Sequence, residues 1–278
     1  MTPGIRVTAG TIGSIIDLRT ARTGWVHSVF THAVNLELGG EMWTVVAHDG
    51  HDAALTVRLS GVVVPGDLRL RIQDPVCVRS SHVRAGASVI DTRTAVRWLP
   101  QMYDVNLCGL GGRAFELEAA ARHVAWEGSW TLADAVAGAL ECGGRSDLEE
   151  AVRRAVGRGP GLTPAGDDVL AGILAVLTAP GVAADCEPFA ARLRAALAPA
   201  LPATNEISRA LLRQASQGHV SRPVWELVRS VLSGRAAAAS APARTGVLAT
   251  GATSGGDTCA GLVAAGRLLS RSLEGIEA

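Results

Sequence analysis

The N-terminal third of the chain shows short apolar runs that alternate with polar positions. Glycine, aspartate and proline turns such as LGGE and VPGD separate these runs, which are rich in β-branched residues. Alternation with a period of two, broken at short intervals by turn residues, is typical of the strands of small β-sandwiches and barrels. We therefore expect an antiparallel barrel or sandwich, with strands within 25–38, 42–48, 53–64, 68–72 and 86–100.

Near Arg113 the apolar residues change to the three- and four-residue spacing of helices. The segments AFELEAAARHVAW, TLADAVAGALE and DLEEAVRRAVG all show it, and each has an alanine-rich face. Beyond them we expect helices joined by Gly/Pro loops. The loosest stretches are 196–204 and 233–246, the second a candidate mobile loop. The pattern predicts an α+β protein with a β-rich part at 1–112 and an all-helical part at 113–278 that contains buried Gly/Ala-rich helices.

Composition limits the partners that we expect. The chain has 278 residues, 48% of them hydrophobic, and its 26 basic and 26 acidic residues cancel. This balance gives no electrostatic reason to expect nucleic acid or an anionic membrane as a partner. Every apolar run is shorter than the roughly 20 residues of a membrane span, and the N-terminus lacks a basic-then-apolar signal pattern. We expect a cytoplasmic protein.

All 26 basic residues are arginine, because the sequence contains no lysine. A P-loop lysine, a lysine general base and Schiff-base or ordinary pyridoxal-phosphate chemistry are therefore excluded. The five cysteines are scattered without a CxxC pair, and the HDGHD stretch at 48–52 also fits a hairpin turn, so we expect no metal site from them. The sequence has no G-x-S-x-G elbow to indicate covalent nucleophilic catalysis. Any anion must be held by arginine, hydroxyls or backbone N–H groups.

The stretch GRGPGLTPAGDDVLAGILAVL, at 157–177, combines glycine turns, two adjacent aspartates and an almost uncharged apolar run. It predicts the start of a buried helix, with Thr163 as the N-cap and Pro164 at the first helical position. Asp167 and Asp168 then fall in the first turn or just past it. The glycines ahead of them would let a ligand approach the backbone closely.

A second stretch, TGATSGGDTCAGLVAAGRLL at 250–269, repeats the frame G-x-T-x-x-G-D and again enters an Ala/Gly/Leu helix. The frame aligns Gly161, Thr163, Gly166 and Asp167 with Gly251, Thr253, Gly256 and Asp257. Two neighbouring helix N-termini present free N–H groups and two positive dipole ends, which suit a small anion. We expect the two loops to lie together at one pocket, with Asp167 and Asp257 approaching each other across it.

Three roles are open for the aspartates. They can cap helices and hold the glycine loops in shape, bind a divalent cation that bridges to substrate, or accept protons from an amide, urea or amine. We favour proton acceptance by Asp167 and Asp257 as the catalytic role, with Mg²⁺ as the alternative and no other cofactor expected. Replacing Asp167 by Asn should then abolish activity. Asp168 should matter less, because the frame aligns it with Thr258.

A third stretch, ATNEISRALLRQASQGHVSRPV at 203–224, can supply uncharged donors from Thr204, Asn205 and Ser208, with Thr204 as a helix cap. An ordinary capped amphipathic helix is the alternative. The predicted substrate-binding residues are Gly161, Thr163, Pro164, Gly166, Asp168, Thr204, Asn205, Ser208, Thr253, Ser254, Gly255 and Gly256.

Three blocks of this sequence resemble the signature blocks of the oxamate carbamoyltransferase AllH-subunit family: GPGLTPAGDDVLAGIL, TNEISRALLRQASQG and TSGGDTCAGL. The segment VHSVFTHAVNLEL is similar to that family's opening strands. The chain departs from the family pattern at Gly256, where a bulky aromatic residue is expected, and at Asn205, where a second small hydroxyl residue is commoner.

The resemblance implies carbamoyl chemistry in allantoin breakdown, in which oxalurate and phosphate give oxamate and carbamoyl phosphate with the help of other subunits. The expected partners are a small carboxylate with a carbamoyl, ureido or amide group, phosphate or carbamoyl phosphate, and partner subunits or a second copy of the chain. Two other hypotheses stay open. One is a non-catalytic binding subunit of a multi-subunit carbamoyltransferase, and the other is a lyase, hydrolase or cyclase acting on an amino- or guanidino-acid on the same scaffold.

Overall fold

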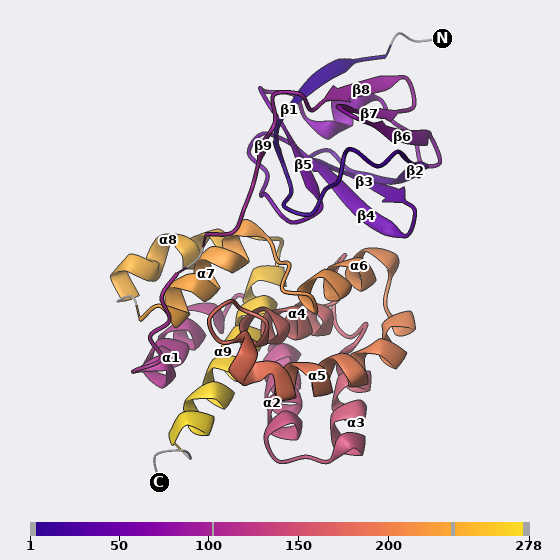
Figure 1. Ribbon diagram of the computed structural model, residues 1–278. Helices are drawn as coiled ribbons and strands as arrows, with labels where there is room; N and C mark the ends of the chain where they lie inside the picture. Colours follow the sequence, from indigo (N-terminus) through magenta and orange to yellow (C-terminus); the bar gives the residue numbers. More distant parts are fainter. Residues whose placement is uncertain (1–3, 102, 235–236, 275–278) are drawn as a thin grey trace. The chain divides into compact units, whose positions relative to one another are not determined.

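The computed structural model describes residues 4–101, 103–234 and 237–274 (Figure 1). The chain divides into two compact units after Gln101. Strands form the first unit and helices form the second, which confirms the α+β class and the order of its two parts.

The first unit contains β1 (Arg6–Ile12), β2 (Arg22–Val29), β3 (Ala33–Leu38), β4 (Glu41–Val46), β5 (Thr56–Leu59), the 3₁₀-turn η1 (Pro65–Leu68), β6 (Pro75–Arg79), β7 (His82–Ala85), β8 (Ser88–Asp91) and β9 (Val96–Arg97). The second contains α1 (Leu110–Ala121), α2 (Glu127–Glu141), α3 (Arg145–Ala155), α4 (Ala165–Leu177), α5 (Ala183–Ala200), η2 (Leu201–Ala203), α6 (Glu206–Ala215), α7 (Arg222–Leu232), α8 (Ala237–Leu248) and α9 (Ser254–Glu274).

Strands β1 to β8 close into a barrel, as predicted for the β-rich part. Their order is β5-β4-β3-β2-β6-β7-β8-β1, the pairing of β1 with β5 completes the ring, and the short β9 adds to β1. The antiparallel expectation is wrong for three pairs, because β4–β5, β1–β8 and β1–β9 are parallel. Tight hairpin turns join antiparallel neighbours, whereas a parallel pair needs a longer connection or strands far apart in sequence. The interior is apolar, with Leu36, Trp43 and Val57 fully buried.

Two predicted strand segments differ in the structure. The run at 68–72 is no strand, because η1 ends at Leu68 and Arg69 turns the chain with a left-handed φ of 53°. The run at 53–64 contains only the four-residue β5. Part of the stretch expected as a mobile loop at 233–246 is helical, since α8 starts at Ala237.

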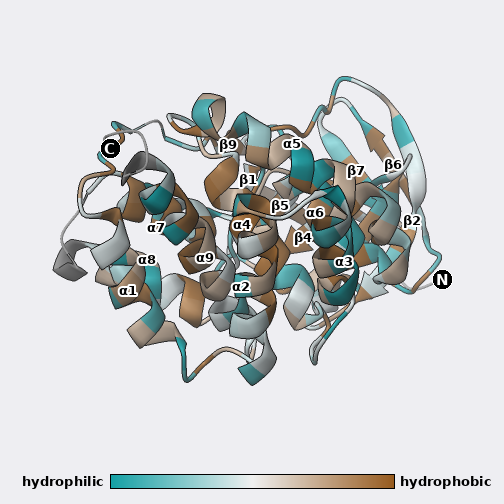
Figure 2. Cartoon of the chain, turned by 90° about the horizontal axis from the view of Figure 1, so that it is seen from below, coloured by the Kyte–Doolittle hydropathy of each residue, from teal (hydrophilic) through white to brown (hydrophobic). Residues whose placement is uncertain are grey.

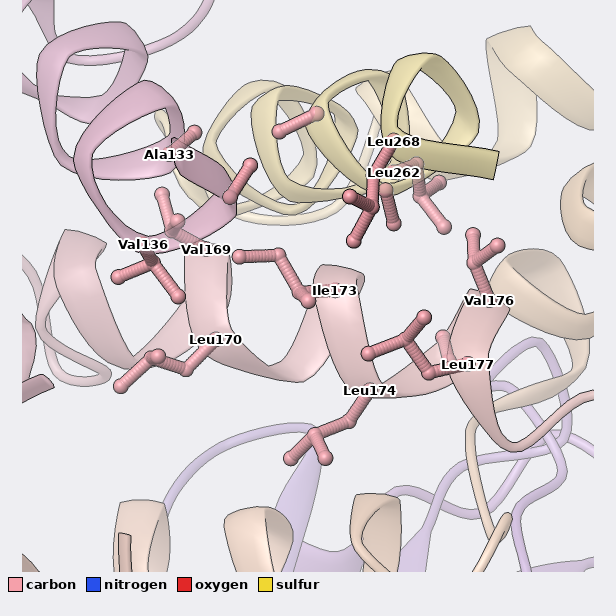
Figure 3. Close-up of a cluster of buried hydrophobic side chains, with 14 of the residues drawn as sticks. Ala133, Val136, Val169, Leu170, Ile173, Leu174, Val176, Leu177, Leu262 and Leu268 are labelled. Carbon is pink, nitrogen blue, oxygen red and sulfur yellow. The ribbon is translucent and has the colours of Figure 1, made fainter. Parts of the chain in front are cut away.

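The helical unit is organised around α4 and α9. Val169, Ile173 and Leu262 are buried between these helices and their neighbours, and Figure 3 shows Val169 and Ile173 on α4 beside Leu262 of α9. In Figure 2, α4 is largely brown, whereas the polar α3 shows teal on its surface. This arrangement agrees with the predicted buried Gly/Ala-rich helices. Within the described residues, no helix is long and apolar enough to cross a membrane.

The helical unit includes chain that precedes the first helix. Tyr103, Val105 and Leu107 pack against the helical core, although they lie in irregular chain. Arg113, where the sequence pattern changes, lies inside α1. Apolar spacing detects only regular elements, so the boundary read from it falls after the division seen in the structure.

Candidate functional site at the start of α4 and α9

Helices α4 and α9 begin side by side. The hydroxyl oxygens of Thr163 and Ser254 lie 2.9 Å apart at this end. Further along, the two helices touch at Gly172 and Gly261, which we call the crossing glycines. A Cβ on Gly172 or Gly261 would lie 2.2 or 2.0 Å, respectively, from a backbone carbonyl oxygen of the other helix. The structure therefore brings the two Gly-Asp loops together, as the sequence frame predicted.

The sequence frame aligned Asp167 with Asp257, but the structure matches the two loops one residue differently. Gly166 and Gly255 occupy equivalent places, since a Cβ on either would lie 2.0 Å from the carbonyl oxygen of a preceding helix. The crossing glycines and the first residues of the two helices show the same shift. Asp168, not Asp167, is the counterpart of Asp257, so the premise that Asp168 has a threonine counterpart is wrong.

Asp167 holds its loop to the third stretch. The residue is 2% exposed, its Oδ1 accepts a hydrogen bond from the Gly157 N–H at 2.8 Å, and its Oδ2 accepts one from the Thr204 hydroxyl. Burial raises the pKa of the Asp167 carboxyl, while these two donors and the Ser208 hydroxyl oppose the rise. Both oxygens are thus occupied by groups of the chain itself.

Asp168 joins the two loops at their mouth. It is half-buried, and its Oδ2 accepts hydrogen bonds from the Thr163 hydroxyl at 2.9 Å and from the Ser254 hydroxyl. Burial raises the pKa of Asp168 to about 7; the two hydroxyl donors oppose this rise, and the charges of Asp257 and Asp167 add to it. A carboxyl of this kind can both donate and accept a proton near neutral pH.

Asp257 supplies the cap that α2 lacks. The N-cap residue of α2 is Trp126, whose side chain makes no capping bond. Asp257 is fully buried, and its Oδ1 accepts hydrogen bonds from the Trp126 N–H at 2.8 Å and the Ser129 hydroxyl at 2.7 Å. Its Oδ2 is buried without a hydrogen-bond partner among the described residues. Asp167 and Asp257 therefore bind different segments of the chain, and the charges of both act on Asp168.

The third predicted stretch also reaches the site. Asn205, not Thr204, is the N-cap of α6: its Oδ1 accepts from the Ser208 N–H at 2.9 Å. The Asn205 amide donates to the Leu162 carbonyl oxygen at 3.0 Å, and Thr204 bonds to Asp167. The Ser208 hydroxyl is buried and acts on Asp167, where it helps to lower the pKa of the carboxyl. The stretch thus closes over the first loop.

The tip of the first loop is open to solvent. Gly161 and Leu162 are exposed, and Gly161 has a φ of 109°, which favours glycine. Pro164 rather than Thr163 precedes the helix as N-cap, since α4 begins at Ala165. A prediction by pattern commonly misses a helix start by a residue. The Thr163 side chain is therefore free to join the cluster around Asp168.

Sequence reasoning missed Arg158. Its carbonyl oxygen accepts the Gly166 N–H at 2.8 Å, which fixes the Arg158 backbone at the start of α4. The residue is exposed, and no carboxylate pairs with its guanidinium among the described residues. The signal in the sequence is a single charged residue within the glycine- and proline-rich GRGPG. An arginine at a helix N-terminus adds to the positive potential there.

The carboxylates are not arranged as a metal centre. No group of three or more His, Cys, Asp or Glu side chains within the described ranges could hold a metal ion. Donors of the chain already bind both oxygens of Asp167 and one oxygen, Oδ1, of Asp257. We therefore assign no Mg²⁺ site to this cluster.

Comparison with known families covers both units. Residues 155–266 match the family described as oxamate carbamoyltransferase subunit AllH, and residues 7–97 match the AllH family N-terminal domain. The chain belongs to the AllH family. No curated protein and no solved structure matched the chain.

The AllH matches cover the barrel strands from residue 7 to residue 97 and the stretches of the site from residue 155 to residue 266. The AllH family is that of a carbamoyltransferase subunit, and this confirms the resemblance seen in the sequence. Gly256, one of the departures from the family pattern, is tightly packed: a Cβ there would lie 2.3 Å from the Ala125 nitrogen. A side chain at this position would require α9 to shift. Thr253 stays at the loop, where its carbonyl oxygen accepts the Asp257 N–H at 2.9 Å.

Proposed function

We propose that this chain is the subunit of an oxamate-type carbamoyltransferase that binds the carbamoyl-bearing carboxylate at the start of α4 and α9. The observation that carries the proposal is the cluster in which Asp168 bonds to Thr163 and Ser254, one from each loop. The family match makes carbamoyl transfer the reaction to which such a cluster would contribute.

The groups at this end of the helices complement oxalurate, which has a carboxylate, carbonyl oxygens and ureido N–H groups. Arg158 is the exposed cation beside the α4 N-terminus and would pair with the substrate carboxylate. The Asp168 carboxylate would accept a ureido N–H. The hydroxyls of Thr163 and Ser254 can rotate to donate to a carbonyl oxygen.

The chemistry needs one proton to move. A phosphate oxygen attacks the carbamoyl carbon, the bond from that carbon to the oxamate nitrogen breaks, and the nitrogen gains a proton as carbamoyl phosphate and oxamate form. Asp168 would take the proton of the attacking hydrogen phosphate and return it to the leaving nitrogen. Its pKa near 7 suits both halves of this transfer. No lysine or covalent nucleophile is required.

The other two aspartates would act by positioning this cluster. Asp167 fixes the first loop through Gly157 and Thr204. Asp257 fixes the start of α9 against α2, and its Oδ2 is buried without a hydrogen-bond partner among the described residues. We derive no step through Mg²⁺, because both oxygens of Asp167 and Oδ1 of Asp257 already accept hydrogen bonds from the chain.

A second candidate is a binding subunit that is inactive alone. Asp167 and Asp257 favour it, because their carboxylates already bind N–H groups of the chain itself. The family description favours it as well, because it names a subunit of a carbamoyltransferase. Both candidates place oxalurate at the same loops. They differ in whether the isolated chain performs the chemistry.

Calorimetric titration of the purified chain with oxalurate and oxamate tests the site. Arg158→Gln should weaken oxalurate binding about 10- to 100-fold, the usual loss for a charge-assisted pair. Arg145→Gln is the matched control, because Arg145 is an exposed arginine of the same unit paired with Glu149. Unaltered affinity in Arg158→Gln, or no binding by the wild-type chain, would refute the proposed site.

Phosphate-dependent cleavage of oxalurate then separates the two candidates. Turnover by the isolated chain, lost in Asp168→Asn, supports the catalytic role. Binding of oxalurate without turnover, with activity appearing only when partner subunits are added, supports the binding subunit.

A further inference from the structure

Strands β6, β7, β8 and β1 are neighbours in the barrel (Figure 1) and carry a row of in-register residues on their outer face. Cys77 of β6 lies opposite Arg84 of β7, Arg84 opposite Val89 of β8, and Val89 beside Arg6 of β1. Residues paired across strands project to the same face of a sheet. Alternate residues of the same strands, such as Val83, are buried in the barrel core, so this row faces outward.

A second row lies two residues along the same strands. Arg79 is opposite His82, and His82 is opposite Asp91. The Asp91 carboxylate is already bound by Arg93, whose Nη2 lies 2.6 Å from Oδ2, whereas His82 Nε2 and Arg6 Nη1 lie 3.8 and 4.0 Å from the same oxygen. The single acid of the two rows is therefore committed to a neighbouring arginine.

The outer face of these strands has an excess of positive charge. Arg79 and Arg84 are exposed, and neither has a carboxylate partner within the described residues. The whole chain is neutral, with 26 basic and 26 acidic residues, so this excess is a local concentration. Gathering like charges costs free energy, which a bound anion would offset.

The two rows surround a hollow of about 230 Å³, lined by Arg6, Cys77, Arg79, His82, Arg84 and Val89. We propose that this hollow binds the phosphate group of a small molecule. Guanidinium groups donate paired hydrogen bonds to phosphate oxygens, and a phosphate dianion balances more positive charge than a carboxylate does. The hollow is smaller than the pockets of drug-sized ligands, so it suits a compact anion. The proposal stands apart from the proposed function, since none of its residues belongs to the α4 and α9 loops.

Cys77 provides a reporter in the wall of the hollow. We expect inorganic phosphate to slow alkylation of Cys77 by N-ethylmaleimide several-fold in the full chain, followed residue by residue by mass spectrometry. Cys108 and Cys142 are exposed thiols of the helical unit, and their rates should not change. Potassium chloride at equal ionic strength controls for screening. Equal Cys77 rates with and without phosphate would overturn the proposal.

Charge-removing variants give the second arm. Calorimetric titration with inorganic phosphate should show binding that is weakened about tenfold or more in Arg84→Gln and in Arg79→Gln. Arg19→Gln is the matched control, because Arg19 belongs to the same unit and its side chain is 94% exposed. The result is contradicted if Arg84→Gln binds phosphate as the wild type does, or if acetate binds more tightly than phosphate. Phosphate binding lost in Arg158→Gln but kept in Arg84→Gln would assign the anion to the helical unit instead.

Discussion

Replacing Asp168 by Asn should stabilise the protein, and more so as the pH rises. Burial raises the pKa of Asp168 from 3.8 to about 7, against the two hydroxyl donors and with help from the charges of Asp257 and Asp167. In the folded chain the protonated form is therefore favoured. Below pH 3.8 the carboxyl is protonated in both states, and its ionisation costs no stability. Between pH 3.8 and about 7 the unfolded chain ionises first, so stability falls as pH rises.

The magnitude follows from the size of this shift. A pKa raised by about three, at about 1.4 kcal/mol for each, means that ionisation of Asp168 costs the folded chain at most about 4 kcal/mol of stability at pH 8. Part of this stability is already lost at pH 5. The Asn amide oxygen can still accept from Thr163 and Ser254, but it carries no charge. The stabilisation of Asp168→Asn over wild type should thus grow by about 2–3 kcal/mol between pH 5 and pH 8.

Urea unfolding of both proteins at pH 5, 6.5 and 8 measures this difference. Asp17→Asn is the control, because a backbone N–H and side chain of Arg19, together with the Thr20 hydroxyl, lower the pKa of Asp17 to about 2. Asp17 is then ionised in both states over the whole range, and its variant should show a pH-independent difference. A gap between Asp168→Asn and wild type that stays flat from pH 5 to pH 8 would refute the reasoning.

Three further substitutions test how the site is held. Gly172→Ala should destabilise the chain by about 1–3 kcal/mol, because its Cβ would meet a carbonyl oxygen of α9. Gly138 has open space around it, so Gly138→Ala is the control and should leave stability unchanged or raise it by up to about 1 kcal/mol. Equal melting temperatures of the two variants would contradict the close crossing of α4 and α9. Asp167→Asn should cost about 1–3 kcal/mol in denaturant unfolding at about pH 4, where relief of the buried charge contributes little, because Asn keeps one acceptor oxygen and loses the hydrogen bond made by the other. Wild-type stability at that pH would remove the structural role of Asp167. Ser129→Ala should cost about 1 kcal/mol in thermal melts through the lost bond to Asp257, and an unchanged melt would argue against capping by that aspartate.

Alternation in the sequence identifies burial more reliably than it identifies strands. The run LRLRI at 68–72 alternates perfectly, and Leu68 and Leu70 are indeed buried. It is nevertheless a turn, because η1 and the left-handed Arg69 redirect the chain. The predicted runs at 25–38 and 42–48 do contain β2, β3 and β4. There the alternating segments pair with one another as neighbouring antiparallel strands.

The closure of the barrel could not be predicted from local pattern. The pairings of β1 with β5 and β8 join segments far apart in the sequence, and neither is made by a hairpin. The strands β6 and β7 were missed because each is short and carries arginine on its outer positions. Such strands gain their stability from neighbours on both sides, which no local window contains.

The site shows the same division between local and distant information. Glycine loops, helix starts and hydroxyl residues were predicted because each has a local signature. The partners of the carboxylates were not, since Trp126 and Ser129 lie in a segment without any motif. The only sign there is a helix start at Trp126 without a capping side chain of its own, which requires an acceptor from elsewhere in the fold.

The one-residue shift between the two loops bears directly on which aspartate can perform chemistry. Asp168 and Asp257 hold the same place in two similar helix starts, yet their surroundings differ. Asp257 is fully buried, and one of its oxygens caps α2. Asp168 is half-buried, and the groups on its carboxylate are hydroxyls that can rotate to serve a ligand. An equivalent position thus serves structure in one loop and remains available to a substrate in the other, which is why we assign proton transfer to Asp168.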